Sequence, residues 1–399
     1  MRNYDIILYG ATGFTGKLTA KYLAGQRQQL RWAIAGRDAR KLQALRDQLS
    51  TTASQLPDIL LADSAVQDTL SALARQARVI ISTVGPYLQH GEALVAACIG
   101  ERAHYVDLTG EPEFVNRMRS RFHAQAAELG LRIVHCCGFD SIPHDLGVYY
   151  TMRLLQDRLG SEALTAASVT VTGTVKAHGD FSGGTWQSAI NAMARPGEHV
   201  RMQRQDKVAE GGKQRRKVMA GMSWPHRQDG DWTAPLPTID AQIVLRSART
   251  LPFYGREFRY SHQVAVGSLP RLLAGAAGVA GIFMGAQFGL TRKLLQKYRQ
   301  SGEGPEPELR SGHWFRVVFD AEVRPQGAAR QYLRTEVAGG DPGYDETAKM
   351  LSESALSLAF GGALLPPAVG VLTPAQAMGD VLLTRLQAAG LRFHELPCS

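Results

Sequence analysis

Three glycines at three-residue spacing, Gly10, Gly13 and Gly16, follow the first strongly apolar stretch of the chain, residues 5–9. The residues after them, 17–23, have helical periodicity. A strand, a glycine turn and a helix in that order bring backbone N–H groups and a helix N-terminus to one point. Such a point binds anions, normally the pyrophosphate of a dinucleotide, although similar turns also occur for structural reasons alone.

A second apolar strand is predicted within residues 30–36, and Arg37 follows it directly. A carboxylate at this place binds the ribose 2′-hydroxyl of NAD, whereas an arginine suits the 2′-phosphate of NADP. Arg37, backed by Arg40 or Lys41, therefore favours NADP. Asp38 comes one residue late and is expected to cap the next helix. The alternative is a solvated basic helix start with no ligand.

The alternation of strand and helix continues along the first third of the chain. Further strands are predicted within residues 58–63, 78–87, 103–111 and 131–140, with helical stretches such as "GEALVAACIG" between them. This order predicts an α/β fold, a Rossmann-type doubly wound parallel sheet, whose ligands bind at the carboxyl ends of the strands. The loops after those ends are where chemistry is expected.

Composition limits the classes of function. The 399 residues suggest two domains, and the 44% hydrophobic and 20% charged content is that of a globular protein. The formal charge of +9 is compatible with nucleic acid, anionic lipid or an anionic substrate. No nucleic-acid-binding motif accompanies it, so nucleic acid is not expected. Four cysteines without metal or disulfide spacing (Cys98, Cys136, Cys137, Cys398) and no apparent signal peptide favour the cytoplasm.

The second half of the chain predicts a different architecture. Strands without intervening helices are expected within 164–177, 240–251, 257–267, 313–324 and 330–340, which indicates a second, α+β domain on a mixed or antiparallel sheet. We expect an NADP-binding domain over 1–140, a substrate domain over 141–342, and C-terminal helices over 343–399 that pack back on both. Residues 196–235 and 301–308 are expected to be mobile.

One uncharged, glycine-rich run, residues 272–290, has about the length of a membrane-spanning helix. Arg271 precedes it and Arg292 and Lys293 follow it. Three interpretations stay open: a true span, an element that touches a membrane or walls an apolar substrate channel, and an ordinary core or dimer interface.

Several motifs together resemble the saccharopine dehydrogenase-like oxidoreductases, and within them the trans-acting enoyl reductases of lipid and polyketide assembly. They are "YGATGFTG", "STVGPYLQHGEALVAAC", "HYVDLTGE", "GFDSIPHDLG", "GGDPGYDETAKMLSESALSLAF" and "GVLTPAQAMGD". The resemblance implies an NADP-dependent reductase with a dinucleotide domain and a substrate-bearing mixed sheet. Saccharopine-forming reductases carry an aspartate-proline-glycine element after the sixth strand, where this chain has Gly138 to Pro143, so saccharopine chemistry itself is disfavoured.

The resemblance and the strand-end positions together assign a cofactor site. The pyrophosphate is expected at Gly10, Thr12, Gly13, Phe14, Thr15 and Gly16, the 2′-phosphate at Arg37 and Lys41, the adenine at Asp63 and Ser64, and the nicotinamide ribose at Thr83, Val84, Gly85 and Pro86. Asp63 is equally compatible with a helix cap. "FSGGTWQS", residues 181–188, either faces the nicotinamide from the second domain or forms a tight turn.

The catalytic group is harder to assign, because hydride transfer is the cofactor's chemistry and the protein has only to orient, polarise and protonate. Polar side chains after strand ends are the candidates: Tyr87, His90, Tyr105, Asp107, His135 and Asp140. Tyr87 is the first choice because it follows the Gly85-Pro86 turn, with packing on the cofactor or a domain interface as its alternative. Asp107 and Asp140 are expected mainly to hold loops, and Cys136 and Cys137 to fill a buried strand end.

The sequence thus predicts NADPH-dependent reduction of an enoyl thioester on a lipid or polyketide chain, presented in trans and carried by a carrier protein. Peripheral membrane contact and a homodimer are left open. Two alternatives remain. One is reduction of an imine or ketone in an amino-acid-like substrate, which needs Arg246, Arg249 or Arg334 to converge on a carboxylate. The other is a non-catalytic regulator that senses NADPH.

Overall fold

A computed structural model describes residues 2–51, 55–179, 216–287, 291 and 307–397 of the protein. The predicted turn at 181–188 lies outside these residues, as do Arg292, Lys293 and Cys398. The two stretches expected to be mobile lie partly outside them, at 196–215 and 301–306.

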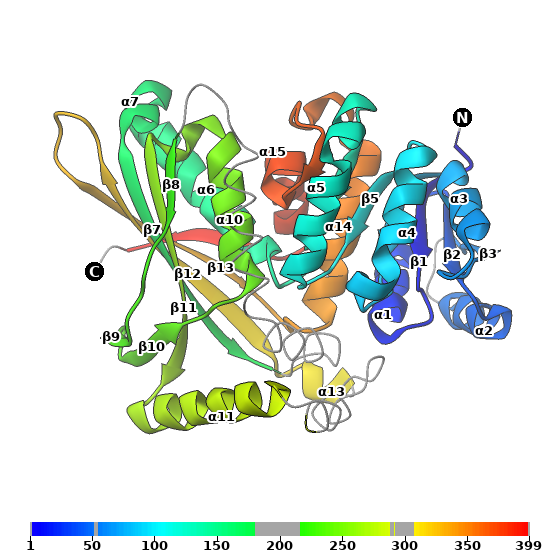
Figure 1. The fold of residues 1–399 in the computed structure, drawn as a ribbon, viewed down its shortest axis with the longest axis horizontal. Helices are drawn as coiled ribbons and strands as arrows, with labels where there is room; N and C mark the ends of the chain where they lie inside the picture. The colour runs from blue at the N-terminus through cyan, green and yellow to red at the C-terminus, as the bar shows by residue number, and fades with distance from the viewer. Residues whose placement is uncertain (1, 52–54, 180–215, 288–290, 292–306, 398–399) are drawn as a thin grey trace.

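The N-terminal part forms a seven-stranded parallel sheet (Figure 1). Its strand order is β14-β6-β5-β4-β1-β2-β3. This confirms the Rossmann-type prediction and all six expected strands, and it adds β14, which comes from the C-terminal region. The strands are β1 (Tyr4–Tyr9), β2 (Trp32–Gly36), β3 (Asp58–Leu61), β4 (Ala77–Ser82), β5 (His104–Asp107), β6 (Arg132–Val134) and β14 (Gly370–Leu372).

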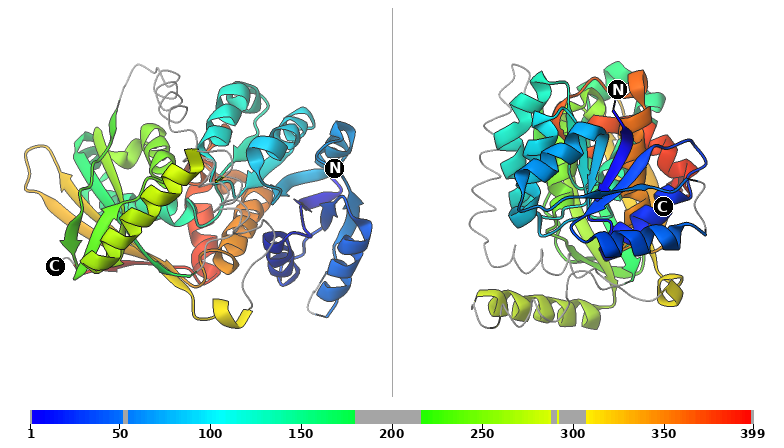
Figure 2. Two further views of the ribbon diagram at one scale, coloured as in Figure 1. Left: turned by 60° about the horizontal axis from the view of Figure 1, so that its bottom comes forward. Right: turned by 90° about the vertical axis from the view of Figure 1, so that its right-hand side faces the viewer.

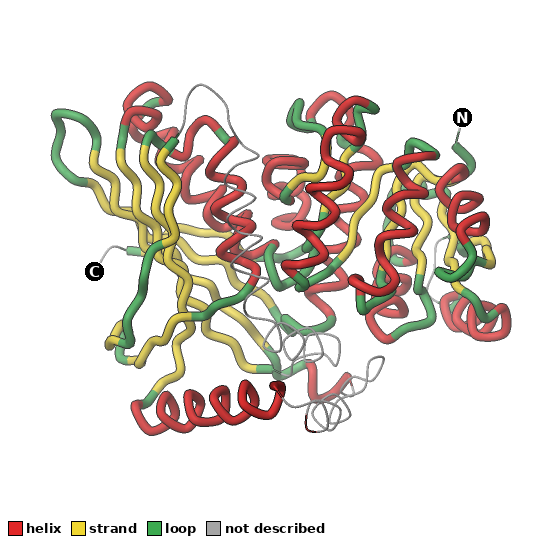
Figure 3. Tube along the Cα trace, in the orientation of Figure 1, coloured by secondary structure: helices red, strands yellow, loops and turns green. Residues whose placement is uncertain are grey.

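Alternating side chains of each central strand go to opposite faces of this sheet. Ile6 and Leu8 belong to the core beneath α1, α2 and α14, whereas Ile7 and Tyr9 belong to the core beneath α3, α4 and α5. The three layers are visible in Figure 3. The helices are α1 (Phe14–Ala24), α2 (Ala39–Leu49), α3 (Gln67–Gln76), α4 (Tyr87–Gly100), α5 (Pro112–Glu128) and α14 (Asp345–Phe360).

The second sheet has eight strands and is mixed, as predicted. Its central strand β7 pairs parallel with β11 and antiparallel with β12. The order is β15-β13-β12-β7-β11-β10-β9, with β8 also on β11. The strands are β7 (Ser168–His178), β8 (Lys217–Ala220), β9 (His226–Gln228), β10 (Asp231–Pro235), β11 (Glu257–Gly267), β12 (Trp314–Arg324), β13 (Gln331–Gly339) and β15 (Arg392–Leu396).

The strand predicted within 240–251 is wrong, because this segment is the helix α10 (Ile239–Thr250). Ile239, Ile243 and Ser247 are buried at four-residue spacing, which is the period of a helix packed on one face. The remaining helices are α6 (Ile142–Leu159), α7 (Ser161–Ala166), α13 (Pro307–Arg310) and α15 (Pro374–Ala388), with short 3₁₀ turns η1 (Pro252–Tyr254) and η2 (Gly362–Leu364).

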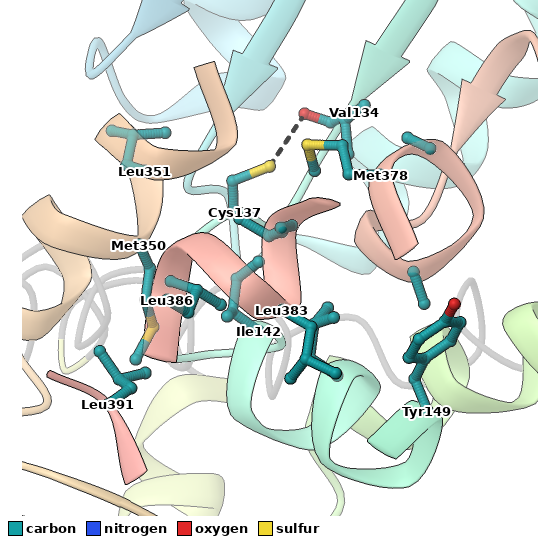
Figure 4. Packing of buried hydrophobic residues seen from close by; sticks show 14 of the residues in the cluster. Val134, Cys137, Ile142, Tyr149, Met350, Leu351, Met378, Leu383, Leu386 and Leu391 are labelled. Carbon is teal, nitrogen blue, oxygen red and sulfur yellow. Dashed lines mark hydrogen bonds between the residues drawn. The ribbon is translucent and has the colours of Figure 1, made fainter. Parts of the chain in front are cut away.

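The C-terminal segment joins the two halves of the molecule. It supplies β14 to the first sheet and β15 to the second, and α14 and α15 lie between them (Figure 1). Figure 4 shows the core at this junction, where Cys137 after β6 lies among Met350, Leu351 and Met378. One hydrophobic cluster therefore runs from the first sheet to the second.

The apolar run forms an exposed helix, α11 (Leu269–Gln287), beside the second sheet (Figures 1 and 2). It is the one helix of the described chain that is long and apolar enough to cross a membrane. Its most apolar 18 residues have a mean hydropathy of 1.4, and 6% of them are buried. A core position is therefore excluded for these residues. The alternatives of a span, a membrane contact, the wall of an apolar substrate channel and an interface between chains remain.

The packing of α6 on the second sheet depends on Gly147. A Cβ atom there would lie 2.2 Å from Cε2 of Phe319, whose ring is fully buried. We expect Gly147→Ala to cost about 1–3 kcal/mol by overpacking, which exceeds the helix propensity that alanine gains. The midpoint of urea unfolding should fall. Gly100→Ala, at the end of α4 with no atom within 4 Å of the added methyl, should leave it unchanged or higher. Equal midpoints for both variants would contradict this account of the packing.

Candidate functional site

The turn between β1 and α1 is closed so tightly that only glycine fits two of its positions. Gly10 has φ +87°, and a Cβ there would lie 2.7 Å from Oγ1 of Thr83 and from Cγ2 of Val84. A Cβ on Gly16 would lie 2.3 Å from the carbonyl oxygen of Gly10. These glycines therefore let the turn lie directly against the loop that follows β4.

The N-terminus of α1 is left open to an anion. Its capping residue is Gly13, which has no side chain to accept from the first-turn N–H groups, and the first turn holds no acidic residue. The next helix differs, because Oδ1 of Asp38 accepts from the backbone N–H groups of Arg40 and Lys41 at 3.0 and 3.1 Å. Uncapped N–H groups and the positive helix end suit a pyrophosphate at α1.

The predicted pyrophosphate residues lie at this open end. Thr12 is partly buried and Gly13 is exposed, and Thr15 stands in the first turn of α1. Phe14 is held from the C-terminal side of the molecule. Its ring lies 4.8 Å from that of Tyr344, and the Arg310 guanidinium stands 5.6 Å from its centroid.

The positions predicted for the adenosine lie after β2 and β3. Arg37 is exposed, Asp38 caps α2, and the Lys41 ammonium is 3.9 Å from the Asp38 carboxylate. Asp63 accepts from the backbone N–H of Ala65 at 2.9 Å, so its carboxylate holds its own loop. Ser64 hydrogen-bonds the hydroxyl of Tyr9, whose pKa is raised mainly by burial.

The loop after β4 completes the same edge. The Thr83 hydroxyl donates to the Gly10 carbonyl at 3.0 Å, which fastens this loop to the glycine turn. Val84 touches the same turn, and the exposed Gly85 and the partly buried Pro86 follow. All the predicted cofactor residues thus follow the carboxyl ends of β1 to β4, at one edge of the sheet.

Tyr87 points away from this edge into the core. It is 5% exposed, its hydroxyl donates to the Ser82 carbonyl at 3.0 Å, and its ring packs on Phe114. Its backbone N–H donates to Glu111. Burial raises its pKa well above the ordinary value. Tyr87 as a proton donor stays a prediction, and this environment is that of a structural tyrosine.

Asp107 and His135 form a buried pair after β5 and β6. His135 Nδ1 lies 2.7 Å from Oδ2 of Asp107, while Oδ1 accepts from the N–H groups of Thr109 and Cys136 at 3.1 and 3.2 Å. The carboxylate therefore holds two loops and one ring in place. The Tyr105 ring stands beside the His135 ring, with 5.8 Å between the ring centroids. Burial raises the pKa of Tyr105 well above the ordinary value.

Asp140 can exchange a proton near neutral pH. Burial, and then the charge of Asp240, raise its pKa to about 7. Its side chain is partly exposed and approaches the loop after β5, since a Cβ on Gly110 would lie 2.8 Å from its Oδ2.

His90, by contrast, is exposed on α4. Cys136 and Cys137 are fully buried, and burial raises the pKa of both thiols.

Sequence reasoning missed a cluster that the fold assembles behind Asp140. His144 of α6, Asp240 of α10 and His262 of β11 are buried together. Burial lowers the pKa of His144 to about 4. The pKa of Asp240 is lowered: burial alone would raise it, but the two histidines and Thr238 stabilise the carboxylate more. No short motif joins the three residues, so only the burial of polar residues in apolar segments could have pointed to them.

Two of the arginines that an amino-acid substrate would need are held by other residues of the protein. Arg246 is buried on α10, where it donates to Asn116 at 2.9 Å. Arg334 lies on β13 and pairs with Asp229 and Asp320. Arg249 also lies on α10, three positions after Arg246. The described residues therefore give this alternative no support.

The residues present fit a dinucleotide. The uncapped N–H groups of α1 and the glycine turn offer a cradle that any side chain at Gly10 would fill. When bound, the dinucleotide would lie at the carboxyl edge of the sheet, where the Gly85-Pro86 loop follows β4 and Asp140 follows β6.

Comparison with known proteins agrees with this site. A family model described as saccharopine dehydrogenase NADP binding domain matches residues 6–134. The fold resembles saccharopine dehydrogenase (L-Glu forming) from Saccharomyces cerevisiae, with a TM-score of 0.55 at 11% identity over 99% of this chain and 100% of that one.

Curated relatives match over nearly the whole length. A Mycobacterium tuberculosis protein named for trans-acting enoyl reductase activity is 39% identical, over 98% of this chain and 97% of its own. The trans-acting enoyl reductases of Mycobacterium bovis and Mycobacterium ulcerans are 36% and 35% identical over the same shares. The chain therefore belongs to the trans-acting enoyl reductases, a family built on a saccharopine dehydrogenase-type NADP-binding domain.

Proposed function

We propose that this protein is an NADPH-dependent enoyl reductase that acts in trans on a long acyl or polyketide chain held as a thioester. The observation that carries the proposal is the match to trans-acting enoyl reductases over 98% of the chain, joined to an uncapped α1 N-terminus behind a glycine turn. The saccharopine-type alternative is less well supported, because Arg246 and Arg334 already contact Asn116 and Asp320 of the protein itself.

The roles of the residues follow from their places. The first turn of α1 would hold the pyrophosphate, and Arg37 the 2′-phosphate. When bound, NADPH supplies a hydride for the β-carbon of the enoyl thioester. The α-carbon then needs a proton, and the Asp140 carboxyl holds one below about pH 7 at this edge. The basic surface of a chain with a formal charge of +9 suits an acidic carrier domain that presents the thioester.

The substrate is tested by NADPH oxidation with two substrate sets. We expect turnover of a long-chain 2-enoyl thioester, with the saturated thioester as product by mass spectrometry. NADPH labelled with deuterium at the transferred position should place the label on the β-carbon. Activity only with the lysine-derived semialdehyde plus glutamate would replace this function by the saccharopine type. Tight NADPH binding with turnover of neither set would favour the regulator.

Arg37 should set the preference for NADPH over NADH. A charge-assisted contact to the 2′-phosphate is expected to make NADPH bind roughly tenfold more tightly or better. Arg37→Ala should remove most of that factor and leave NADH affinity unchanged, because NADH lacks the phosphate. Titration by intrinsic fluorescence measures both affinities. Arg27→Ala, an exposed arginine after α1, is the matched control and should keep the preference. Equal affinities in the unmodified protein would contradict the prediction.

We also propose that α11 contacts a lipid surface. Its large exposed side chains, at 100° per residue, lie within an arc of about 140°. They are Leu269, Leu273, Val279, Phe283 and Met284, between 40% and 64% exposed. The other faces are mostly alanine and glycine, and the only charged residue within the helix is Arg271. An apolar face beside basic flanks suits an anionic bilayer, on which the helix would lie peripherally.

Flotation with vesicles tests this contact. The protein should float with vesicles that contain phosphatidylglycerol, and less with phosphatidylcholine alone or at high salt. Leu273→Glu places a charge in the apolar face and should reduce flotation several-fold. Leu364→Glu, at an 82% exposed site in η2, is the control and should not change it. Absence of flotation with either vesicle would refute the proposal, and retention in membranes through an alkaline wash would indicate a span.

A further inference from the structure

Three buried side chains with metal-binding chemistry meet where the two halves of the protein join. His144 comes from α6, which follows the last strand of the N-terminal half, and Asp240 and His262 come from α10 and β11. They are 1%, 3% and 7% exposed. The described residues contain this one group of at least three potential ligands, and its ligand atoms all lie within 4.8 Å of one another.

The separations in this cluster are longer than those of well-formed hydrogen bonds. Oδ2 of Asp240 lies 3.4 Å from Nε2 of His262 and 3.8 Å from Nε2 of His144. Hydrogen bonds of this kind measure about 2.7–3.2 Å. Two other buried histidine–aspartate pairs in the same protein obey that rule, His135–Asp107 at 2.7 Å and His313–Asp341 at 2.6 Å. The cluster therefore differs from an ordinary histidine–carboxylate pair.

The shorter separation, between Asp240 and His262, is that of two ligands around one ion, and His144 at 3.8 Å would have to move closer by a few tenths of an ångström. Nitrogen and oxygen ligands about 2.0–2.1 Å from a tetrahedral Zn²⁺ lie about 3.3–3.4 Å apart. Two imidazoles and one carboxylate are a donor set that proteins use for Zn²⁺ and for other divalent first-row metals. The fourth tetrahedral position would remain for a non-protein ligand such as water.

The surroundings orient the ligands for this task. The Tyr260 hydroxyl lies 3.1 Å from Nδ1 of His262, which leaves Nε2 to face Asp240, and that Nε2 has no hydrogen-bond partner although it is buried. Ser141 donates to Oδ1 of Asp240 at 3.3 Å, and Thr238 donates to Oδ2. Partners of this kind commonly hold metal ligands in place from behind.

We propose that His144, Asp240 and His262 bind one Zn²⁺ ion, which joins α6 to α10 and β11. The ion would neutralise the buried Asp240 charge and give Nε2 of both histidines a closer partner than the Asp240 carboxylate provides. Because the ligands are buried, the ion should be taken up on folding and released on unfolding, so that it contributes to stability. The proposal concerns metal content and is independent of which substrate the enzyme reduces.

The first test is the metal content of untagged full-length protein. After expression in zinc-supplemented medium and mild chelator washing, the protein should retain about one Zn²⁺ per chain. Inductively coupled plasma mass spectrometry measures this content. Removal by a strong chelator under mildly destabilising conditions should lower the thermal midpoint, and added Zn²⁺ should restore it. Protein loaded with Co²⁺ should show the visible absorption of a tetrahedral site. Less than about 0.1 metal per chain after supplementation, with no Co²⁺ spectrum, would overturn the proposal.

Matched variants locate the ion. Asp240→Asn and His262→Gln keep the side-chain size but remove a ligand, and we expect Zn²⁺ to fall to below about 0.2 per chain. His313→Gln breaks a buried histidine–aspartate pair elsewhere and should keep the full metal content. If the two ligand variants fold and keep as much Zn²⁺ as the unmodified chain, the assignment is wrong. If they do not fold, the Co²⁺ spectrum of the unmodified chain decides.

Discussion

The helix of the cofactor turn is tied to the C-terminal helices by one buried carboxylate. Glu353, in the middle of α14, is 4% exposed, and its oxygens accept from the Tyr22 hydroxyl of α1 and from Nε of Arg385 of α15, both at 2.6 Å. A buried carboxylate loses its hydration, so both partners are needed to keep it in the core. Burial and the Glu353 charge together raise the pKa of Tyr22 above its ordinary value. One side chain thus joins the helix of the cofactor turn to the C-terminal helices.

The rest of α14 is suited to that position. Almost every residue of the helix is buried, and its serines Ser352, Ser354 and Ser357 donate to carbonyls one turn earlier, so that their hydroxyls need no outside partner. Small side chains allow α1 and the first sheet to approach closely. Because α1 is held from both ends, by Tyr22 and by the contact of Phe14 with Tyr344, its uncapped N-terminus is fixed where the pyrophosphate should bind.

The cofactor half could be predicted because its signals are local. A strand, a glycine turn and a helix follow one another directly around Gly10 to Gly16. Each further strand repeats this order. The helix α10 was predicted as a strand because Ile243, Val244 and Leu245 form a short apolar run. The four-residue spacing from Ile239 and the turn at Thr238 were the better signals. The strands β14 and β15 are short and pair with distant partners, so nothing local marks them.

The candidate site could be predicted only in part for the same reason. The residues predicted to bind the cofactor pyrophosphate would do so largely through backbone, and glycines reveal backbone geometry in a sequence. Tyr87 stood in the right loop, but the direction of its side chain depends on the Ser82 carbonyl and on Phe114. His144, Asp240 and His262 are separated by 96 and 22 positions in numbering, and only the packing of α6 and α10 on β11 brings them together.

The inner face of the second sheet is packed with large aromatic side chains. Phe315, Phe319 and Tyr260 fill it, and Gly147 of α6 lies against the Phe319 ring. On the outer face, a cavity of about 530 Å³ is lined by polar residues such as Thr172, Gln263 and Asp320 and by the exposed Met222 and Trp224. A reductase that acts in trans has to admit only the enoyl thioester to the nicotinamide. The rest of the acyl chain can stay with its carrier or in a lipid layer. In the described part of the protein, α11 is the exposed apolar helix that could contact such a layer.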